Sequence, residues 1–585
     1  MKRIISLALA LVLLASCVAV LASCGAPKDS GAEISVYLGE EIYDFDPTDY
    51  YVDSNAEQVM SLLFEPLFTV NEKGKLKKEG AAKDYDVDKD ERTITIELRE
   101  TYWSDEIRVT ANDFLYAWRD ILLEPTNANP AAALLYDIEN AVAVKSGEKS
   151  LYELGVDVTD TYELTITYRE GADYEQLLKN LACVATSPVR QDMATSSNAG
   201  YWTKIINTAV TNGAFKIDNI DYESGTFTVS RNIGYHQNPT EKRYTDEVIP
   251  NKLISFTNNE GNTVPVSYND LVNKTVFYMA DAPLADRSAN KGSASVADDL
   301  STYTYVFNTE KELFADAKVR RALSLAIDRN AIISAITFGK AATGFLPDSV
   351  LIPGTKDSFR NQNLIAAEAK MDEALTLLGE VDLTGISKDI TLSVNDDPES
   401  LAIADIVKAA WEELGFTVEI DAVGSVSSKV VDFTTNEQIT INDSGIQRMV
   451  KEASRGERDF DVIAVDWQMY STDPFVALCA FAESFSGCGA LMDNGSKELL
   501  GSFGGYCDED YNDLIRAAYL TTGSSRIDIL RIAEKVLVDS ACIVPLVYNQ
   551  SFAFIHEDIS DVEFDGLGNF VLKMAEQKDY EDYLD

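Results

Sequence analysis

The sequence predicts an α/β protein, and three segments support this prediction. Residues 390–420 have the pattern of a strand, a helix and a second strand, which is the unit that builds a parallel sheet. Residues 460–465 form a short apolar run, which is typical of a strand buried on both faces. Residues 92–122 begin with strand-like alternation and continue with helical periodicity. The chain has 585 residues, of which 46% are hydrophobic, so it can bury a sizeable core.

The segment 92–122 lies in the N-terminal part of the chain. Apolar residues alternate with polar ones and predict a half-buried strand, with Ile94, Ile96 and Leu98 on one face. Thr110 and Asp113 then form a capping-box pattern, with Asp in place of the usual Glu, so a helix should begin here. Helical spacing predicts the buried stripe of this helix: Phe114, Trp118, Ile121 and Leu122.

A long helix is expected after Asp316. Its predicted buried face consists of apolar residues at helical spacing: Val319, Leu323, Ala326, Ile327 and Ile333. Arg320, Arg321 and Arg329 are expected on the opposite, solvated face. A cluster of arginines invites an anion-binding interpretation, but pairing with the acidic surface is favoured at this spacing.

The segment 390–420 gives the clearest local prediction. Ile390, Leu392 and Val394 alternate as a strand, and a turn at 395–398 follows. Apolar residues at helical spacing then predict a helix that Gly415 ends: Ile403, Ile406, Ala410, Trp411 and Leu414. Phe416, Val418 and Ile420 alternate again, which completes a strand–helix–strand unit with a right-handed crossover.

The apolar strand 460–465 runs directly into Asp466 and Trp467. Ligands of open α/β sheets bind beyond the carboxyl ends of the strands, so Trp467 and the residues after it are expected to line a cleft.

Composition excludes several classes of function. The formal net charge of −46 would repel phosphate backbones, so no nucleic-acid partner is expected. The chain has two histidines, His236 and His556, which argues against a His-rich metal site and against most nucleophile–base pairs. No nucleophile elbow, phosphate loop or paired-His zinc helix is present in the sequence. We therefore expect no enzyme activity, no metal and no cofactor.

The N-terminus predicts export. Lys2 and Arg3 precede an apolar run, 4–22, which has the layout of a secretory signal. Leu21-Ala22-Ser23-Cys24 resembles a bacterial lipobox, which makes Cys24 the expected lipidated residue after a signal peptide of residues 1–23, followed by a tether at 24–33. Cys17 is the rival, but cleavage there would leave an apolar start. The alternative is an uncleaved membrane anchor. In both cases the folded part lies outside the cytoplasmic membrane, and in the lipoprotein interpretation the lipid alone attaches it to the membrane.

Five cysteines follow the signal and are interpreted as structural: Cys183, Cys479, Cys488, Cys507 and Cys542. Outside the cytoplasm a disulfide is permitted, but an odd number leaves at least one free thiol and the pairing stays open.

Several motifs together resemble the peptide-type extracellular solute-binding proteins of ABC importers, family 5, which include oligopeptide- and dipeptide-binding proteins. They occur in family order through most of the chain after the lipobox: 62–68, 98–105, 109–114, 212–215, 231–235, 307–329, 411–415, 466–474 and 543–546. Each motif alone is weak, and their order makes the resemblance specific.

The resemblance implies a two-lobed periplasmic-binding-protein fold, class II and cluster C, with an extra subdomain in the first lobe and a hinge between the lobes. Mapped onto this chain, the first lobe comprises 34–304 and 545–585, with 66–190 as the extra subdomain, and the second lobe comprises 305–544. The crossings are expected near 305–308 and 545–548.

Two departures from the family pattern are visible. The family usually has Ser-Asp-Gly where this chain has Glu106 after Asp105, so that turn must avoid a positive φ or be strained. In oligopeptide binders an Asp three residues after the cleft Trp anchors the α-ammonium of the ligand, and here that position is Tyr470. Either Asp466 or Asp473 replaces this anchor, or the ligand has no ammonium there.

The resemblance implies these ligand-binding candidates: Gly39, Glu40, Glu41, Tyr305, Asp466, Trp467, Tyr470 and Asp473. The expected function is a monomeric, lipid-anchored receptor that captures oligopeptides and delivers them to the permease subunits of an ABC importer. Alternatives are the same fold binding another solute, such as an oligosaccharide stacked on Trp467 and Tyr470, and a surface sensor or scaffold without transport. A secreted hydrolase using Asp466 and Asp473 is the disfavoured enzyme alternative.

Overall fold

The computed structural model describes these residues: 32–39, 42, 44–49, 56–236, 251–258, 265–491, 497–499 and 502–579. The predicted signal peptide, Cys17, Cys24, Glu40 and Glu41 lie outside them. Among the described residues, no helix combines the length and the apolar character needed to span a bilayer.

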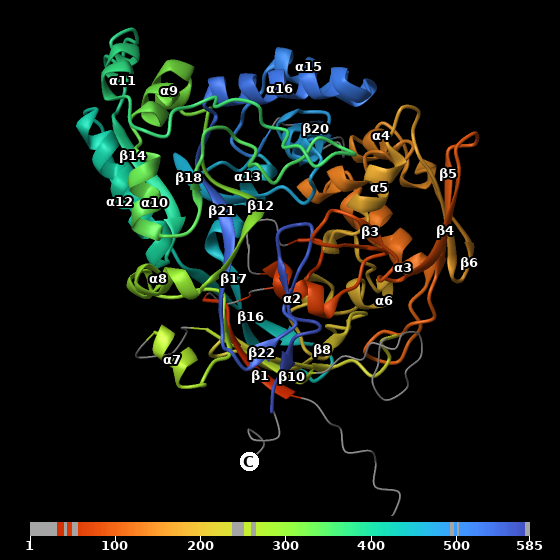
Figure 1. Ribbon diagram of the computed structural model, residues 1–585. Helices are drawn as coiled ribbons and strands as arrows, with labels where there is room; N and C mark the ends of the chain where they lie inside the picture. The colour runs from red at the N-terminus through yellow and green to blue at the C-terminus, as the bar shows by residue number, and fades with distance from the viewer. Residues whose placement is uncertain are drawn as a thin grey trace, which may run out of the picture.

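One eleven-stranded sheet runs through the whole molecule (Figure 1). Parallel and antiparallel pairs alternate along it in blocks, as expected for an α/β protein with long-range connections. Its strands, in spatial order, are β15 (Thr417–Val423), β14 (Asp389–Asn395), β18 (Val462–Gln468), β12 (Ser295–Phe307), β21 (Ile543–Ile555), β11 (Tyr278–Met279), β1 (Ala32–Tyr37), β10 (Asn251–Thr257), β9 (Thr226–Arg231) and β8 (Phe215–Asp221), with β13 (Lys340–Ala341) also paired to β21.

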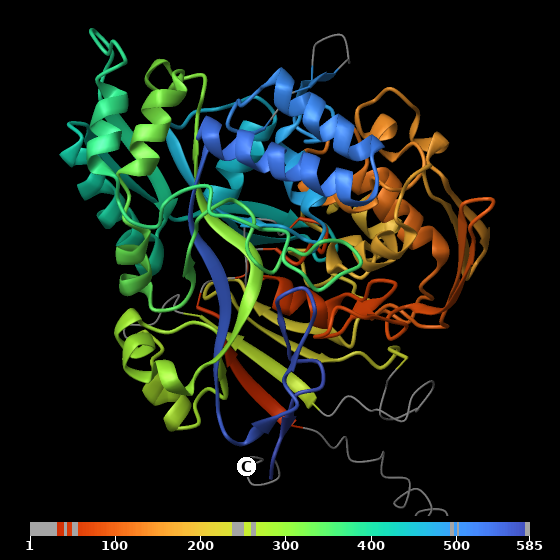
Figure 2. The same cartoon turned by 45° about the horizontal axis from the view of Figure 1, so that its top comes forward.

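Two long antiparallel strands, β12 and β21, connect the two ends of this sheet (Figure 2). Beyond one edge of the pair lie β11, β1, β10, β9 and β8, which we call the first-lobe strands. Beyond the other edge lie β18, β14 and β15, the second-lobe strands. The pairing of β12 with β21 is interrupted between Asp298 and Thr302. The fold is therefore two α/β lobes joined through a pair of strands.

A four-stranded antiparallel sheet forms the extra part of the first lobe, at the right of Figure 1. Its strands in spatial order are β4 (Ala82–Asp88), β5 (Thr93–Leu98), β7 (Glu163–Thr167) and β6 (Val156–Asp160). The predicted half-buried strand is β5, and the predicted helix start is α3 (Ala111–Tyr116), whose capping box joins Thr110 and Asp113. Glu106, at the position where the family has Gly, adopts a φ of 68°, so this turn is strained.

Shorter helices complete the first lobe around this sheet and the main one: α2 (Ala56–Leu63), α4 (Ala141–Lys145), α5 (Tyr174–Asn180), α6 (Gln191–Ala194), α7 (Tyr268–Val272) and α8 (Leu284–Asn290). Three-residue to six-residue helical turns lie between them, of which η2 (Pro130–Leu135) and η1 (Ala117–Leu122) are the longest. Of the predicted stripe, Phe114, Trp118 and Leu122 are fully buried.

The predicted strand–helix–strand unit is confirmed. β14 and β15 pair in parallel, and α12 (Pro398–Glu413) connects them. Gly415 ends the helix with a φ of 90°, a conformation that side chains with a Cβ rarely adopt. The apolar strand predicted at 460–465 is longer than expected, because β18 continues through Asp466 and Trp467 to Gln468.

The prediction of one long helix after Asp316 is wrong in two respects. The structure has two helices, α9 (Ala317–Leu325) and α10 (Arg329–Ile336), because Asp328 caps the second one. Arg329 is 1% exposed, and Arg320 is buried as well. Both guanidinium groups donate to backbone carbonyls, Arg320 to Ser540 at 2.8 Å and Arg329 to Pro545 at 2.8 Å. They tie α9 to the end of α16 (Gly523–Ser540) and α10 to the start of β21.

The remaining second-lobe elements follow β15 and β18. A separate hairpin, β16 (Ser425–Asp432) with β17 (Glu437–Ser444), leads into α13 (Gly445–Ser454). After β18 come α14 (Pro474–Leu478), α15 (Glu509–Leu520) and α16 (Gly523–Ser540), while α11 (Met371–Leu378) packs against α9. All five cysteines after the signal are described, and none of them is joined to another in a disulfide.

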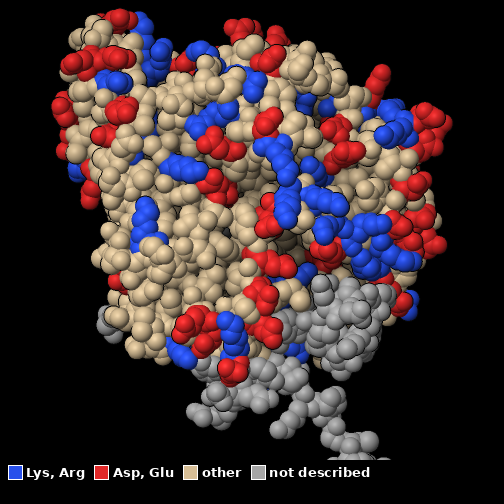
Figure 3. Space-filling view, in the orientation of Figure 1, with Lys and Arg blue, Asp and Glu red and all other residues tan. Residues whose placement is uncertain are grey.

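Charged side chains cover the surface in mixed order. On the face shown in Figure 3, Lys and Arg side chains lie beside Asp and Glu side chains. The described residues include exposed ion pairs, such as Lys83 with Glu97 at 2.5 Å. Exposed pairs of this kind contribute little to stability.

Candidate ligand-binding site

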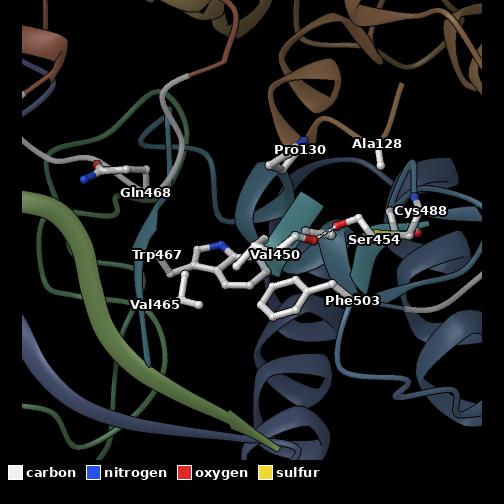
Figure 4. Close-up of a pocket in the computed structure, with 11 residues that line it drawn as sticks. Ala128, Pro130, Val450, Ser454, Val465, Trp467, Gln468, Cys488 and Phe503 are labelled. Atoms are coloured by element: carbon white, nitrogen blue, oxygen red, sulfur yellow. Dashed lines mark hydrogen bonds between the residues drawn. The ribbon is translucent and has the colours of Figure 1, made fainter. Parts of the chain in front are cut away.

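A pocket of about 440 Å³ of empty space, part of it open to solvent, lies between the two lobes. The first lobe contributes the loop before η2 and the second lobe contributes α13, β18 and the segment after α14, as Figure 4 shows. Its lining residues are Ala128, Pro130, Val450, Ser454, Val465, Trp467, Gln468, Ala480, Ser486, Cys488 and Phe503.

Trp467 forms one wall of the pocket and is held by other rings. Its indole stacks on Phe481 at 4.7 Å and on Phe503 at 5.7 Å between ring centroids, and Phe345 contacts it edge-on at 5.9 Å. Aromatic pairs in these geometries stabilise beyond the area that they bury. The indole therefore has a fixed orientation.

The opposite wall is a loop held by a buried ammonium. Lys145, which is 1% exposed, donates to the carbonyls of Leu122 at 2.8 Å, Glu124 at 3.1 Å and Asn127. Asn129 donates to the carbonyl of Thr48 and caps η2 by accepting from Ala131. These bonds position the loop that carries Ala128 and Pro130 against the second lobe.

Ion pairs between the lobes lie next to the pocket. Lys451 of α13 is 2.5 Å from Asp49 of the first lobe, and Gln447 donates to the carbonyl of Asp49 at 3.0 Å. Lys204 of the first lobe pairs with Asp443 of β17 and lies 3.5 Å from Asp44. We call these five charged residues, Asp44, Asp49, Lys204, Asp443 and Lys451, the charged contact.

The tip of the β16–β17 hairpin extends this contact. Asp432 accepts hydrogen bonds from the side-chain amides of Asn198 at 3.2 Å and Asn207 at 2.9 Å, both in the first lobe. The backbone NH of Phe433 donates to Asn198 Oδ1 at 3.0 Å. These amide bonds, with those from Thr434 and Thr435, lower the pKa of Asp432 to about 2, although partial desolvation opposes them.

A third carboxylate between Asp44 and Asp49 has the opposite shift. Burial, and then the charges of Asp44 and Asp49, raise the pKa of Asp46 to about 7. Its Oδ1 accepts from the Thr48 hydroxyl at 2.7 Å and from the Thr48 NH at 2.9 Å, which limits the shift.

A further polar contact between the lobes fixes the chain just after Trp467. Ser471 donates to Asn180 of α5 at 2.7 Å, and Gln176 donates to Ser471 at 3.3 Å. Tyr470, which directly precedes Ser471, is buried and has a φ of 59°, which is strained for a non-glycine residue.

The structure places the predicted site residues unequally. Trp467 lines the pocket, and Tyr470 lies three residues further along the same segment. Asp466 is on the opposite face of β18 from Val465 and Trp467, because successive side chains of a strand alternate. It accepts from the side-chain amide of Asn549. Its carboxylate therefore faces away from the pocket.

Asp473 also lies outside the pocket lining. It caps α14 by accepting from the NH of Phe475 at 3.0 Å. Its carboxylate binds both terminal nitrogens of Arg526, at 2.9 and 3.2 Å, and the residue is 2% exposed. In this arrangement the charge of Asp473 is already compensated within the second lobe.

Tyr305 and Gly39 lie elsewhere. Tyr305 is fully buried in the core of the second lobe, with its ring 6.2 Å from that of Trp411. Gly39 follows β1 with a φ of 91°, and a Cβ there would collide with the side chain of Asp281. Glu40 and Glu41 fall outside the described residues. Within those residues, no group of three or more His, Cys, Asp or Glu side chains is placed to hold a metal ion.

Most pocket residues were missed by the sequence predictions. Val450 and Ser454 could have been found, because they lie four residues apart on one face of the helix before β18. Ala128, Ser486 and Phe503 come from irregular segments without periodicity, so no local signal marks them.

The fold and the cleft define a two-lobed solute-binding protein. A family model described as bacterial extracellular solute-binding proteins, family 5 (middle part), matches residues 78–487, more than half of the chain. The chain therefore belongs to family 5 of the bacterial extracellular solute-binding proteins. Among curated relatives, the oligopeptide-binding protein OppA of Bacillus subtilis is 23% identical over 530 residues, covering 89% of each chain.

Solved structures agree on the fold. Listeria monocytogenes OppA bound to peptide superposes with a TM-score of 0.75 at 19% identity, covering 94% of this chain and 99% of that one. The murein tripeptide-binding protein MppA of Escherichia coli gives a TM-score of 0.72 at 22% identity, covering 94% of this chain and 98% of that one. A structure described as the unliganded open form of MppA gives a TM-score of 0.53 at 22% identity, covering 94% of this chain and 99% of that one.

Proposed function

We propose that this protein captures oligopeptides between its two lobes and delivers them to an ABC importer. The observation that carries the proposal is the pocket at Trp467, which both lobes line and which lies beside the charged contact. A ligand there would touch both lobes at once and would stabilise their closed arrangement. The peptide-binding relatives support peptides as the ligand class.

The lobe division follows the sequence prediction, with 34–304 and 545–585 in the first lobe and 305–544 in the second. The interrupted ladder between Asp298 and Thr302 supports a hinge in this region, because a break in strand pairing lets the two strands bend. We further propose that the protein is exported, that Cys24 carries the lipid and that binding and delivery require no catalytic step.

The test uses the protein expressed from Gly25 onward. Mass spectrometry of the purified protein should detect a mixture of co-purified peptides. After these are removed, pools of synthetic peptides should raise the Tm by several degrees, because a ligand that binds only the folded state stabilises it by mass action.

Two outcomes would contradict the proposal. Co-purification of a sugar, together with a Tm that sugars raise and peptides do not, would assign a different solute. A Tm that no peptide pool changes would remove peptides as ligands. Lipidation is tested separately on the full chain, since Cys24→Ser should abolish acyl labelling whereas Cys17→Ser should leave it.

A further inference from the structure

We propose that the pocket beside Trp467 selects ligands that place an uncharged, apolar side chain in it. This inference rests on the proposed function and adds to it a preference at one subsite. For an oligopeptide ligand, the favoured side chains are aromatic or branched aliphatic, and Lys, Arg, Asp and Glu are disfavoured at the position that enters the pocket.

The first argument is the chemistry of the lining. Of the eleven lining residues that the structure describes, eight are apolar, and the other three, Ser454, Gln468 and Ser486, are uncharged. Two of these three already have partners. Ser454 donates to the carbonyl of Val450 at 2.8 Å, and Ser486 Oγ accepts from the NH of Cys488 at 3.1 Å. Figure 4 shows Gln468 at the margin, directed away from the rings of Trp467 and Phe503.

The second argument is that the buried ammonium of Lys145 already has acceptors. Lys145 lies behind the wall, since a Cβ on Gly487 would be 3.6 Å from its Nζ. An ammonium has three donor hydrogens, and the carbonyls of Leu122, Glu124 and Asn127 accept from this one. An acidic ligand group would therefore compete with three existing bonds, and a basic group would meet no carboxylate among the described lining residues.

The third argument is rigidity. The stacking of Trp467 on Phe481 and Phe503 and the hydrogen bonds of the loop at Ala128 hold two walls of the pocket in place. A charged side chain packed against these walls would lose part of its hydration without gaining a charged partner, and this is unfavourable. An apolar side chain gains free energy from the same desolvation, because apolar surface leaves water.

The test measures binding of alanine pentapeptides in which one position carries Phe, Leu, Lys or Glu. Five positional series are compared by isothermal titration calorimetry with the protein expressed from Gly25 onward. We expect one position at which Phe or Leu binds at least about tenfold more tightly than Lys or Glu. Binding of all peptides with no such position, or with a charged side chain preferred at every position, would overturn the inference and leave the proposed function intact. No binding by any peptide would overturn both.

A variant at the first-lobe wall tests the assignment of the subsite. Ala128 lies on a partly exposed loop, so Ala128→Asp should fold, which a thermal melt checks. The new carboxylate should lower the affinity for peptides with Phe at the selective position and raise the affinity for peptides with Lys there, by about tenfold each. Thr126→Asp, which adds the same charge to an exposed position of the same loop, is the matched control and should change neither. Equal effects of the two variants would overturn the assignment.

Discussion

The contact between the lobes has two regions of different chemistry. Around Trp467 the lobes meet through rings, Ala128 and Pro130. At the charged contact and the hairpin tip they meet through ion pairs and amide hydrogen bonds, such as Lys204 with Asp443 and Asn207 with Asp432. The first region contains the pocket, and in the second region side chains of one lobe bind side chains of the other directly.

The difference indicates a division of roles. Ionic contacts exchange for hydration at little net free energy, so the charged contact can form and break as the lobes move. The apolar surface of the pocket contributes free energy when a ligand covers it, because that surface then leaves water. We therefore expect the charged contact to guide closure and the Trp467 region to make closure depend on the ligand. Three variants test this distinction.

The largest effect is expected for Trp467→Ala. The change removes ring contacts to Phe345, Phe481 and Phe503 and one wall of the pocket. Truncation of a buried Trp destabilises by about 3–5 kcal/mol, so the Tm should fall by several degrees. Peptide affinity, measured by calorimetry on the folded variant, should fall by at least about tenfold.

The matched control is Phe433→Ala at the hairpin tip, where the ring is 59% exposed. Its removal should change stability by less than about 0.5 kcal/mol and leave peptide affinity unchanged. If Trp467→Ala retained full affinity, the pocket would not be the ligand site.

A smaller effect is expected for Lys204→Met. The change leaves Asp44 and Asp443 without the cation between them, and so weakens closure without touching the pocket. Peptide affinity should fall by about fivefold, because a mostly buried cation that joins the lobes is lost, and the difference from the parent protein should shrink in high salt. Titrations at low and high ionic strength measure both.

Lys318→Met is the control for this variant. Lys318 pairs with Glu380 at 2.8 Å within the second lobe, and both side chains are about half exposed. Affinity should not change. A Lys204→Met protein with parental affinity at low salt would show that the charged contact has no part in closure.

Local patterns explain which parts of the fold could be predicted. The β14–α12–β15 unit and β5 were predicted because their periodicity and caps lie within about 30 residues. The burial of Arg329 could not be predicted from local sequence, because the carbonyl that accepts its hydrogen bond, that of Pro545, is 216 residues away. Trp467 was found because it ends a buried strand, whereas Ala128 and Phe503 reach the pocket from irregular segments that only the packed lobes bring together.

The smallest expected effect is the pH dependence of stability due to Asp46, which lies between Asp44 and Asp49 of the charged contact. In the folded protein burial and the neighbouring Asp44 and Asp49 raise its pKa from 3.8 to about 7. Between these values the folded state holds a proton that the unfolded state has released. Stability from this group is therefore full below pH 4 and is lost as the pH rises toward 7. Asp46→Asn removes this loss and keeps an oxygen that can accept from Thr48.

The Tm of Asp46→Asn should equal the parental Tm near pH 4.5 and exceed it by a degree or two near pH 7.5, a small difference because water reaches part of this side chain. Asp432→Asn is the control of opposite sign. Its pKa of about 2 keeps the parental carboxylate ionised in both states above pH 5, so its loss should lower the Tm equally at pH 5.5 and 7.5. If the two variants showed the same pH dependence, Asp46 would be ionised throughout this pH range, which would contradict the raised pKa.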